Sequence, residues 1–197
     1  MSDAVVIAIV GAESTGKTQL AQELAQSLAQ HTGLATTWVP EVLREWCDAR
    51  GRTPRADEQA NIAREQHARI DAAAAKHAVV VSDTTALMTA VYSRLLFDDE
   101  SLLSYAVEQQ RRCAITLLTA LDLPWQADGL QRDGPHVCAP VDALVRHWLL
   151  AHGLEWSVVA GVGPQRLQAA LDAVAPRLRA RGSPGQGLFT RLAERNA

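Results

Sequence analysis

The feature that most constrains this chain is an eight-residue segment near its start, Gly11-Ala12-Glu13-Ser14-Thr15-Gly16-Lys17-Thr18. It has the spacing G-x-x-x-x-G-K-T, in which glycines let backbone N–H groups turn towards phosphate oxygens. An apolar β-branched run, Ala4–Val10, precedes it, and an amphipathic stretch, Lys17–Gln30, follows. This strand–loop–helix order is the context that a phosphate-binding loop needs, because the helix N-terminus points at the bound anion. A Gly-rich turn before an ordinary helix is the alternative.

The segment predicts binding of ATP and Mg²⁺. Lys17 carries the charge that reaches the β- and γ-phosphates, and it is therefore also a catalytic candidate. The Thr18 hydroxyl can bind Mg²⁺. The residues expected to contact ATP are Gly11, Glu13, Ser14, Thr15, Gly16, Lys17, Thr18 and Gln19.

Beyond this loop, short β-branched runs alternate with long amphipathic stretches. The strands are expected at Ala4–Val10, Thr36–Val39, Val79–Val81, Ile115–Leu118 and Trp156–Val159. The helices are expected at Lys17–Gln30, Val42–Arg50, Asp57–Lys76, Thr85–Leu96, Ser101–Arg111, Ala139–Ala151 and Pro164–Arg179. This alternation predicts an α/β fold of the P-loop NTPase type (nucleoside/nucleotide kinase-like), with three layers and a five-stranded parallel sheet. Residues 1–181 are expected to form one domain, and residues 182–197, which begin with Gly-Ser-Pro-Gly-Gln-Gly, a flexible tail.

Composition excludes several classes of protein. The chain has 197 residues and a formal net charge of −3, from 19 basic and 22 acidic residues, so no basic excess indicates nucleic-acid binding. Its three cysteines have no metal-ligand spacing. We see no leader sequence and no apolar run long enough to cross a membrane. These observations predict a cytoplasmic protein.

Two acidic positions follow expected strands, at the sheet edge where ligands of such folds bind. Asp83 comes directly after the third strand and can hold Mg²⁺ or serve as the base; capping the next helix is the alternative. Glu41 and Arg44 follow the second strand. Glu41 can take a proton from a substrate hydroxyl, and Arg44 can clamp a phosphate or orient that carboxylate. The alternative for Glu41 and Arg44 is an exposed charge pair at the start of a helix, without a functional role.

Further candidates for substrate contacts lie on the long third helix and in a Gly- and Asp-rich segment after the fourth strand. Gln59 and Gln66 share one helix face, although glutamines are common on protein surfaces. The segment Asp122–Gly134 is predicted to be a lid, with Trp125 stacking on a heterocycle and Arg132 stabilising the charge on transferring phosphate. A surface loop anchored by Trp125 is the alternative.

With these residues in place, the chain resembles the ribosylnicotinamide kinase domain of NadR-type NAD-salvage proteins, within a wider set of P-loop ATPases and kinases of the AAA-like kind. The resemblance extends from about Val5 to Leu178. It rests on GAESTGKT, VPEVLREW, the helix with Gln59 and Gln66, VSDTT followed by Met88-Thr89, and LDLPWQADGLQRDG.

The resemblance implies ATP-dependent phosphorylation of the 5′-hydroxyl of nicotinamide riboside. It also implies that Asp83 serves Mg²⁺ or the substrate hydroxyl, that Glu41 and Arg44 line the substrate cleft, and that Trp125 and Asp128 belong to the lid.

The leading hypothesis is therefore an enzyme that phosphorylates nicotinamide riboside or a similar nucleoside, with ATP and Mg²⁺ as its cofactors. Its catalytic residues would be Lys17, Asp83, Glu41 and Arg132, and its substrate-binding residues Glu41, Arg44, Gln59, Trp125 and Asp128. A P-loop ATPase that uses nucleotide to switch partner binding is the alternative. The expected ligands are ATP and a small nucleoside-like molecule, without nucleic acid or membrane, and the oligomeric state stays open.

Overall fold

Five parallel strands form the centre of the protein, in the order β2-β3-β1-β4-β5. The structure is a computed structural model, and it describes residues 4–126 and 134–181. The strands are β1 (Val5–Val10), β2 (Thr36–Val39), β3 (Val79–Asp83), β4 (Ile115–Thr119) and β5 (Trp156–Val159). The predicted five-stranded parallel sheet is therefore confirmed.

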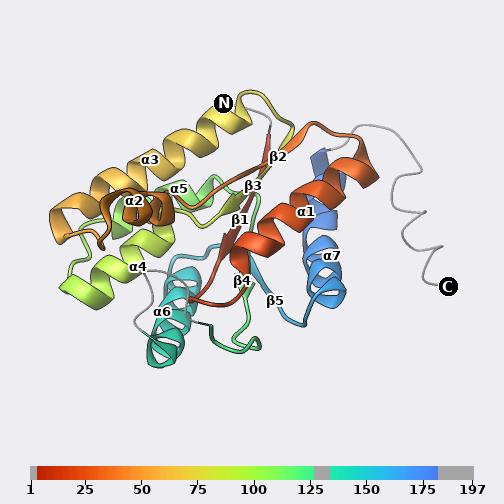
Figure 1. The fold of residues 1–197 in the computed structure, drawn as a ribbon. Coiled ribbons are helices and arrows are strands. Elements are labelled where there is room, and N and C mark those ends of the chain that lie inside the picture. Colours follow the sequence, from red (N-terminus) through yellow and green to blue (C-terminus); the bar gives the residue numbers. More distant parts are fainter. Residues whose placement is uncertain (1–3, 127–133, 182–197) are drawn as a thin grey trace.

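Helices cover both faces of this sheet (Figure 1). They are α1 (Lys17–Thr32), α2 (Val42–Arg50), α3 (Ala56–Ala74), α4 (Ala86–Phe97), α5 (Leu103–Arg111), α6 (Cys138–Ala151) and α7 (Pro164–Arg181). A short 3₁₀ turn, η2 (Pro135–Val137), precedes α6. None of the helices within the described ranges is long and apolar enough to cross a membrane.

Each face of the sheet has its own hydrophobic core. On one face α1 and α7 pack on the sheet, and the buried stripe Leu20, Leu24 and Leu28 of α1 meets Ile7 and Ile9 of β1. On the other face, apolar side chains of α3, α4, α5 and α6 cluster around Val10 and Leu118. Both faces are covered, so the central strand β1 is apolar along its whole length, as expected for a buried parallel strand.

The order of the strands determines where a ligand can bind. From β1 the chain first builds β2 and β3 on one side and then crosses to β4 and β5 on the other. Crevices at such a reversal, beside the carboxyl ends of the strands, are the usual ligand sites of open α/β sheets. Here β1 lies between β3 and β4, so the loop after Val10 has Asp83 on one side and Thr119 on the other.

The expected element boundaries agree with the structure to within a few residues. The main difference at the ligand edge is β3, which extends to Asp83 because Asp83 pairs in register with Ile9. The strand ends before Thr84, whose φ of 68° turns the chain towards α4. Asp83 is therefore part of the sheet, and Thr85, not Asp83, caps α4 by accepting from the Leu87 N–H.

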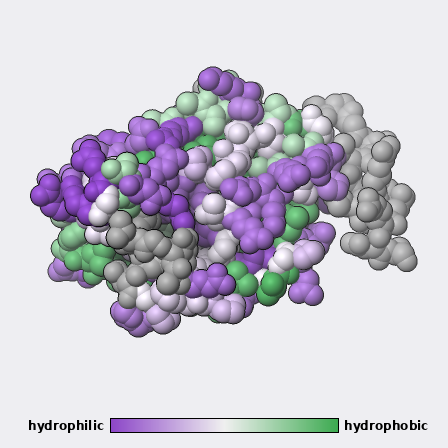
Figure 2. Space-filling view, in the orientation of Figure 1, coloured by the Kyte–Doolittle hydropathy of each residue, from purple (hydrophilic) through white to green (hydrophobic). Residues whose placement is uncertain are grey.

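The outer helices α2 and α3 are joined by surface charges. Arg69 of α3 bonds to Glu45 of α2 at 2.5 Å, and Arg52 bonds to Glu58 at 2.7 Å. The Arg52 contact, with the Arg55 N–H, lowers the Glu58 pKa to about 2. The first pair links α2 to α3, and the second links the turn after α2 to α3. Exposed pairs of this kind contribute little to stability. Hydrophilic side chains cover most of the visible surface over these two helices (Figure 2).

Candidate active site

The segment Gly11–Thr18 forms a tight loop between β1 and α1. At Gly11, where φ is 146°, a Cβ atom would lie 2.1 Å from Thr119 Oγ1. Only glycine fits such a close approach. Gly16 adopts the left-handed conformation, with φ 74°, immediately before α1. Both glycines of the motif are therefore required by the backbone path, which directs the N-terminus of α1 into the loop.

Hydrogen bonds within the loop hold its shape. The Thr15 hydroxyl donates to Ala12 O at 2.8 Å and accepts from the Thr119 hydroxyl at 2.7 Å. The Lys17 ammonium donates to the same Ala12 carbonyl at 2.7 Å. Lys17 thus lies folded over the loop, within reach of an anion held there. By contrast, the Gln19 side chain is exposed and bonds to Glu23 at 2.8 Å.

Thr18 and Asp83 form the part of the site suited to a cation. The Thr18 hydroxyl donates to Asp83 Oδ2 at 2.6 Å, and Asp83 is 1% exposed. The other carboxylate oxygen, Asp83 Oδ1, is buried and has no hydrogen-bond partner within residues 4–126 and 134–181. Burial raises the Asp83 pKa, although Thr18, Lys17 and Arg44 oppose that effect. A hydroxyl beside an unsatisfied carboxylate oxygen fits Mg²⁺, a hard cation that takes few protein ligands and otherwise binds water and phosphate.

Among the described residues no group of three or more His, Cys, Asp or Glu could hold a metal ion. The Thr18–Asp83 pair is consistent with that result, because most ligands of a nucleotide-bound Mg²⁺ come from phosphate and water.

A second carboxylate, Glu41, lies close to the first. Glu41 is the N-cap residue of α2 and forms an ion pair with Arg44, with Nε 3.7 Å from Oε2. Burial raises the Glu41 pKa; Lys17 opposes this, Asp83 adds to it, and Arg44 opposes it. The sequence placed Glu41, Asp83 and Lys17 in three separate segments, and the structure brings them within electrostatic reach of one another.

The two glutamines of α3 have different surroundings. Gln66 is 2% exposed; its Oε1 accepts from the Val42 N–H at 2.8 Å, and its Nε2 donates to Pro40 O at 3.2 Å. These two partners flank Glu41, so Gln66 holds the backbone of Glu41, and the suggested substrate contact of Gln66 is replaced by this role. Gln59 is also 2% exposed, but its Oε1 has no hydrogen-bond partner in the described structure.

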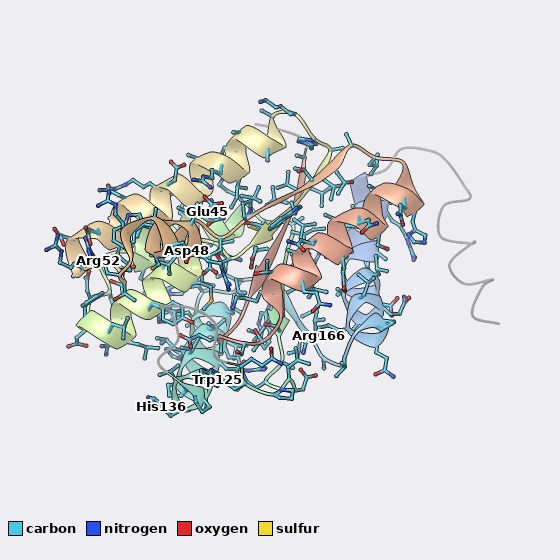
Figure 3. All side chains as sticks on the ribbon, viewed as in Figure 1. Glu45, Asp48, Arg52, Trp125, His136 and Arg166 are labelled. Carbon is cyan, nitrogen blue, oxygen red and sulfur yellow. The ribbon has the colours of Figure 1, made fainter. Side chains whose placement is uncertain are left out.

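The segment after β4 returns to the phosphate loop. The Ser14 hydroxyl donates to Gln126 O at 2.7 Å and accepts from the Gln126 N–H at 2.9 Å. Trp125 lies on the α6 side of the molecule (Figure 3), and its Nε1 is buried with no partner in the described ranges. Asp128 and Arg132 lie outside the described residues.

Comparison with known proteins identifies the family. The family model described as AAA domain matches residues 6–166. The chain belongs to this family. A search of curated proteins finds no match for this AAA-domain chain.

Solved structures confirm the P-loop NTPase fold. A NadR protein in complex with NAD and AMP-PNP is similar with a TM-score of 0.72 and 21% identity, over 93% of this chain and 52% of that one. A NadR protein in complex with NR is similar with a TM-score of 0.67 and 21% identity, over 88% of this chain and 51% of that one. A thymidylate kinase from Ehrlichia chaffeensis is similar with a TM-score of 0.61 and 14% identity, over 88% of this chain and 98% of that one. The chain thus spans about half the length of the NadR structures. The resemblance read from the motifs is confirmed at the level of family and fold.

Three residues of this AAA-domain chain near the phosphate loop were missed as site residues by the sequence analysis. Thr119 packs against Gly11 and donates a hydrogen bond to the Thr15 hydroxyl. Arg166 of α7, 5% exposed, donates to Thr15 O at 2.7 Å. Asp122 pairs with Arg166 and accepts from the Gly161 N–H at 2.6 Å, so it anchors the start of the expected lid. The signal for Thr119 was a polar residue ending an apolar strand beside β1. The signal for Arg166 was its place in the segment after the fifth strand, which by itself does not indicate a contact with Thr15.

Proposed function

We propose that this protein transfers the γ-phosphoryl group of ATP to the 5′-hydroxyl of a small nucleoside, with nicotinamide riboside as the first candidate. The observation that carries the proposal is the pair of carboxylates beside Lys17 at the phosphate loop, of which Asp83 is buried and Glu41 is 11% exposed. A loop that only bound nucleotide would have no need of the second carboxylate. A transferase needs one carboxylate for the metal and one for the acceptor proton.

The roles follow from the contacts. Thr18 and Asp83 would hold Mg²⁺, which when bound neutralises part of the phosphate charge. Lys17 would leave Ala12 O and bind the γ-phosphate. The acceptor oxygen forms a bond to the γ-phosphorus, the bond from that phosphorus to the β–γ bridging oxygen breaks, ADP leaves, and Glu41 takes the hydroxyl proton. Burial makes the ionised Glu41 a stronger base, while Lys17 and Arg44 favour its ionised form.

The acceptor would lie between Glu41 and the segment after β4. Gln59 Oε1 and Trp125 Nε1 are buried without partners among the described residues, and they would supply one acceptor and one donor for a polar heterocycle. Arg44 would orient Glu41 or contact the transferring phosphate. Asp128 and Arg132 keep their proposed roles in substrate binding and in charge stabilisation, with Arg132 as the second cation. The NadR structures with NR and with AMP-PNP support this choice of ligands by fold likeness.

We also propose that residues 1–181 make up the kinase domain and that residues 182–197 lie outside it. Helix α7, the last one in the part of the chain that the structure describes, ends at Arg181. A chain that ends at Arg181 should therefore retain ATP binding.

The decisive experiment is an assay of ATP-dependent phosphorylation over a panel of nucleosides that includes nicotinamide riboside, with the phosphorylated product detected by mass spectrometry. Glu41→Gln should lower product formation by at least about a hundredfold while ATP still binds. Glu45→Gln is the matched control, because Glu45 lies on the same helix but pairs with Arg69 on the surface. ATP hydrolysis without transfer to any nucleoside would refute the kinase and favour a nucleotide-dependent switch.

A further inference from the structure

Arg166 makes an unusual set of contacts for a residue outside the phosphate-loop motif. Its side chain is 6% exposed and uses all three nitrogens. Nε donates to Gly161 O at 2.8 Å, Nη1 to Thr15 O at 2.7 Å, and Nη2 to Asp122. One guanidinium therefore joins the loop after β5, the segment after β4 and the phosphate loop. Figure 3 places it near the start of α7, close to the end of α1 that faces the loop.

The contact with Thr15 O affects the next residue along the chain. In a trans peptide the C=O and N–H groups point in opposite directions. A cation that holds the Thr15 carbonyl from the α7 side therefore directs the Gly16 N–H away from α7. The Gly16 carbonyl is already used by the Leu20 N–H in the first turn of α1. The Gly16 N–H itself has no protein acceptor among the residues that the structure describes.

The rest of the Thr15–Gly16 peptide is also prevented from turning. The Thr15 side chain is fixed by Ala12 O and by Thr119. Asp122 accepts hydrogen bonds from both Arg166 and the Gly161 N–H. These contacts tie the guanidinium to the loops after β4 and β5, so it stays in place if the phosphate loop moves. An arginine suits this task because its planar fork can serve three acceptors at once, which an ammonium cannot.

We propose that Arg166 is a positioning residue for phosphate binding: it holds the Thr15 carbonyl so that the Gly16 N–H faces the phosphate chain of the nucleotide. The proposal rests on the proposed binding of ATP and names one further residue that this binding requires. Because Arg166 acts on a phosphate-facing amide, its loss affects ligands through their phosphates and leaves the nucleoside part alone.

The test compares Arg166→Met and Arg166→Lys with the wild-type chain. The affinities for ADP and for inorganic tripolyphosphate are measured by calorimetry, and the Gly16 amide proton is followed by NMR at ADP saturation. Arg177→Met is the matched control, because Arg177 lies on the same helix and pairs with Glu155 away from the loop. Thermal unfolding of each variant shows that it is folded at the temperature of the assay.

We expect Arg166→Met to weaken binding of both ligands by about ten- to a hundredfold, the usual effect of one charge-assisted hydrogen bond. The downfield shift of the Gly16 amide proton on ADP binding should be smaller in Arg166→Met than in the wild type. Arg177→Met should match the wild type. Arg166→Lys should lie between, because an ammonium can reach Thr15 O but not all three acceptors. If Arg166→Met does not fold, Arg166→Lys decides the question by the same two measurements.

Wild-type affinity for both ligands in a folded variant would overturn the proposal. Weaker ADP binding with unchanged tripolyphosphate binding would also overturn it, since the contact would then act on the nucleoside side through Gly161. A wild-type chain that binds neither ligand would instead remove the proposed ATP-dependent function itself, and the two failures are therefore distinguishable.

Discussion

The phosphate half and the acceptor half of the site are built in different ways. The phosphate half is one continuous segment, Gly11–Thr18. Hydrogen bonds join its residues to one another and to Thr119, Asp83 and Arg166. The proposed acceptor half combines Glu41 at the N-cap of α2, Gln59 of α3 and Trp125 of the segment after β4. Its polar atoms are partly unsatisfied: Gln59 Oε1 and Trp125 Nε1 have no partner among the described residues.

This difference indicates which half is common to many proteins and which is particular to this one. A phosphate chain is the same in every nucleotide, so its site can be finished and rigid before ligand arrives. An acceptor differs from enzyme to enzyme, and buried donors and acceptors left without protein partners are what select it. Substitutions in the two halves should therefore have separable effects.

The largest effect is expected in the phosphate half. Lys17→Ala removes the charge that binds the transferring phosphate, so phosphoryl transfer should fall by about a thousandfold or more. Circular dichroism should show an unchanged fold, because Lys17 belongs to neither hydrophobic core. The rate is measured by ADP release coupled to an indicator reaction. Near-normal turnover would disprove the assignment of this loop.

The two carboxylates test whether the halves have separate chemistry. Asp83→Asn should lower the rate by at least about a hundredfold and raise the Mg²⁺ concentration needed for half-maximal rate. Glu41→Gln should lower the rate by a similar factor with an unchanged Mg²⁺ requirement. Rates are measured across a Mg²⁺ titration. If the metal requirement changes in Glu41→Gln and not in Asp83→Asn, the two roles are exchanged.

A smaller effect is expected at Gln66, which holds the backbone on both sides of Glu41. Gln66→Ala should lower kcat by about tenfold, within the range for a misplaced general base, and leave the KM for ATP unchanged. Asn61→Ala is the control, because Asn61 lies on the exposed side of the same helix. Steady-state kinetics in both substrates separate these parameters. An increase in the KM for ATP would show that Gln66 supports the phosphate half as well.

The last effect concerns the stability of the fold, not the rate of the reaction. His67 of α3 is 4% exposed, and its Nε2 accepts from the Ala86 N–H of α4 at 3.4 Å. Burial, with a contribution from Arg112 that outweighs Asp71, lowers the His67 pKa from 6.5 to about 4. The unfolded chain therefore takes up a proton first, and stability that is complete above pH 6.5 is lost as pH falls towards 4.

At pH 5 this loss amounts to roughly 2 kcal/mol, because one pKa unit corresponds to about 1.4 kcal/mol. Urea unfolding at pH 7 and pH 5 measures it. In His67→Gln the difference between the two pH values should shrink by about that amount, whereas the exposed His147→Gln should behave as wild type. An unchanged pH dependence in His67→Gln would show that another group is responsible.

The elements of the fold could be predicted from the sequence because their signals are local. The expected strands Thr36–Val39 and Trp156–Val159 and the expected helix Val42–Arg50 have the observed bounds. β-branched runs and a 3.6-residue apolar period depend on neighbouring residues only. The end of β3 was missed by two residues because Asp83 is polar, and only its pairing with Ile9 of β1 makes it part of a strand.

By itself, the sequence determined the phosphate loop, because a backbone that turns around phosphate needs glycine, lysine and threonine at fixed spacing within one segment. It also brought Asp83 and Glu41 to the ligand edge, since the carboxyl ends of parallel strands lie together. Only the tertiary structure decided that Gln66 holds Glu41, that Thr119 supports Gly11, and that Arg166 reaches Thr15 across 151 positions of the chain. Such contacts depend on the order of strands and the packing of helices, and no local pattern of residues encodes them.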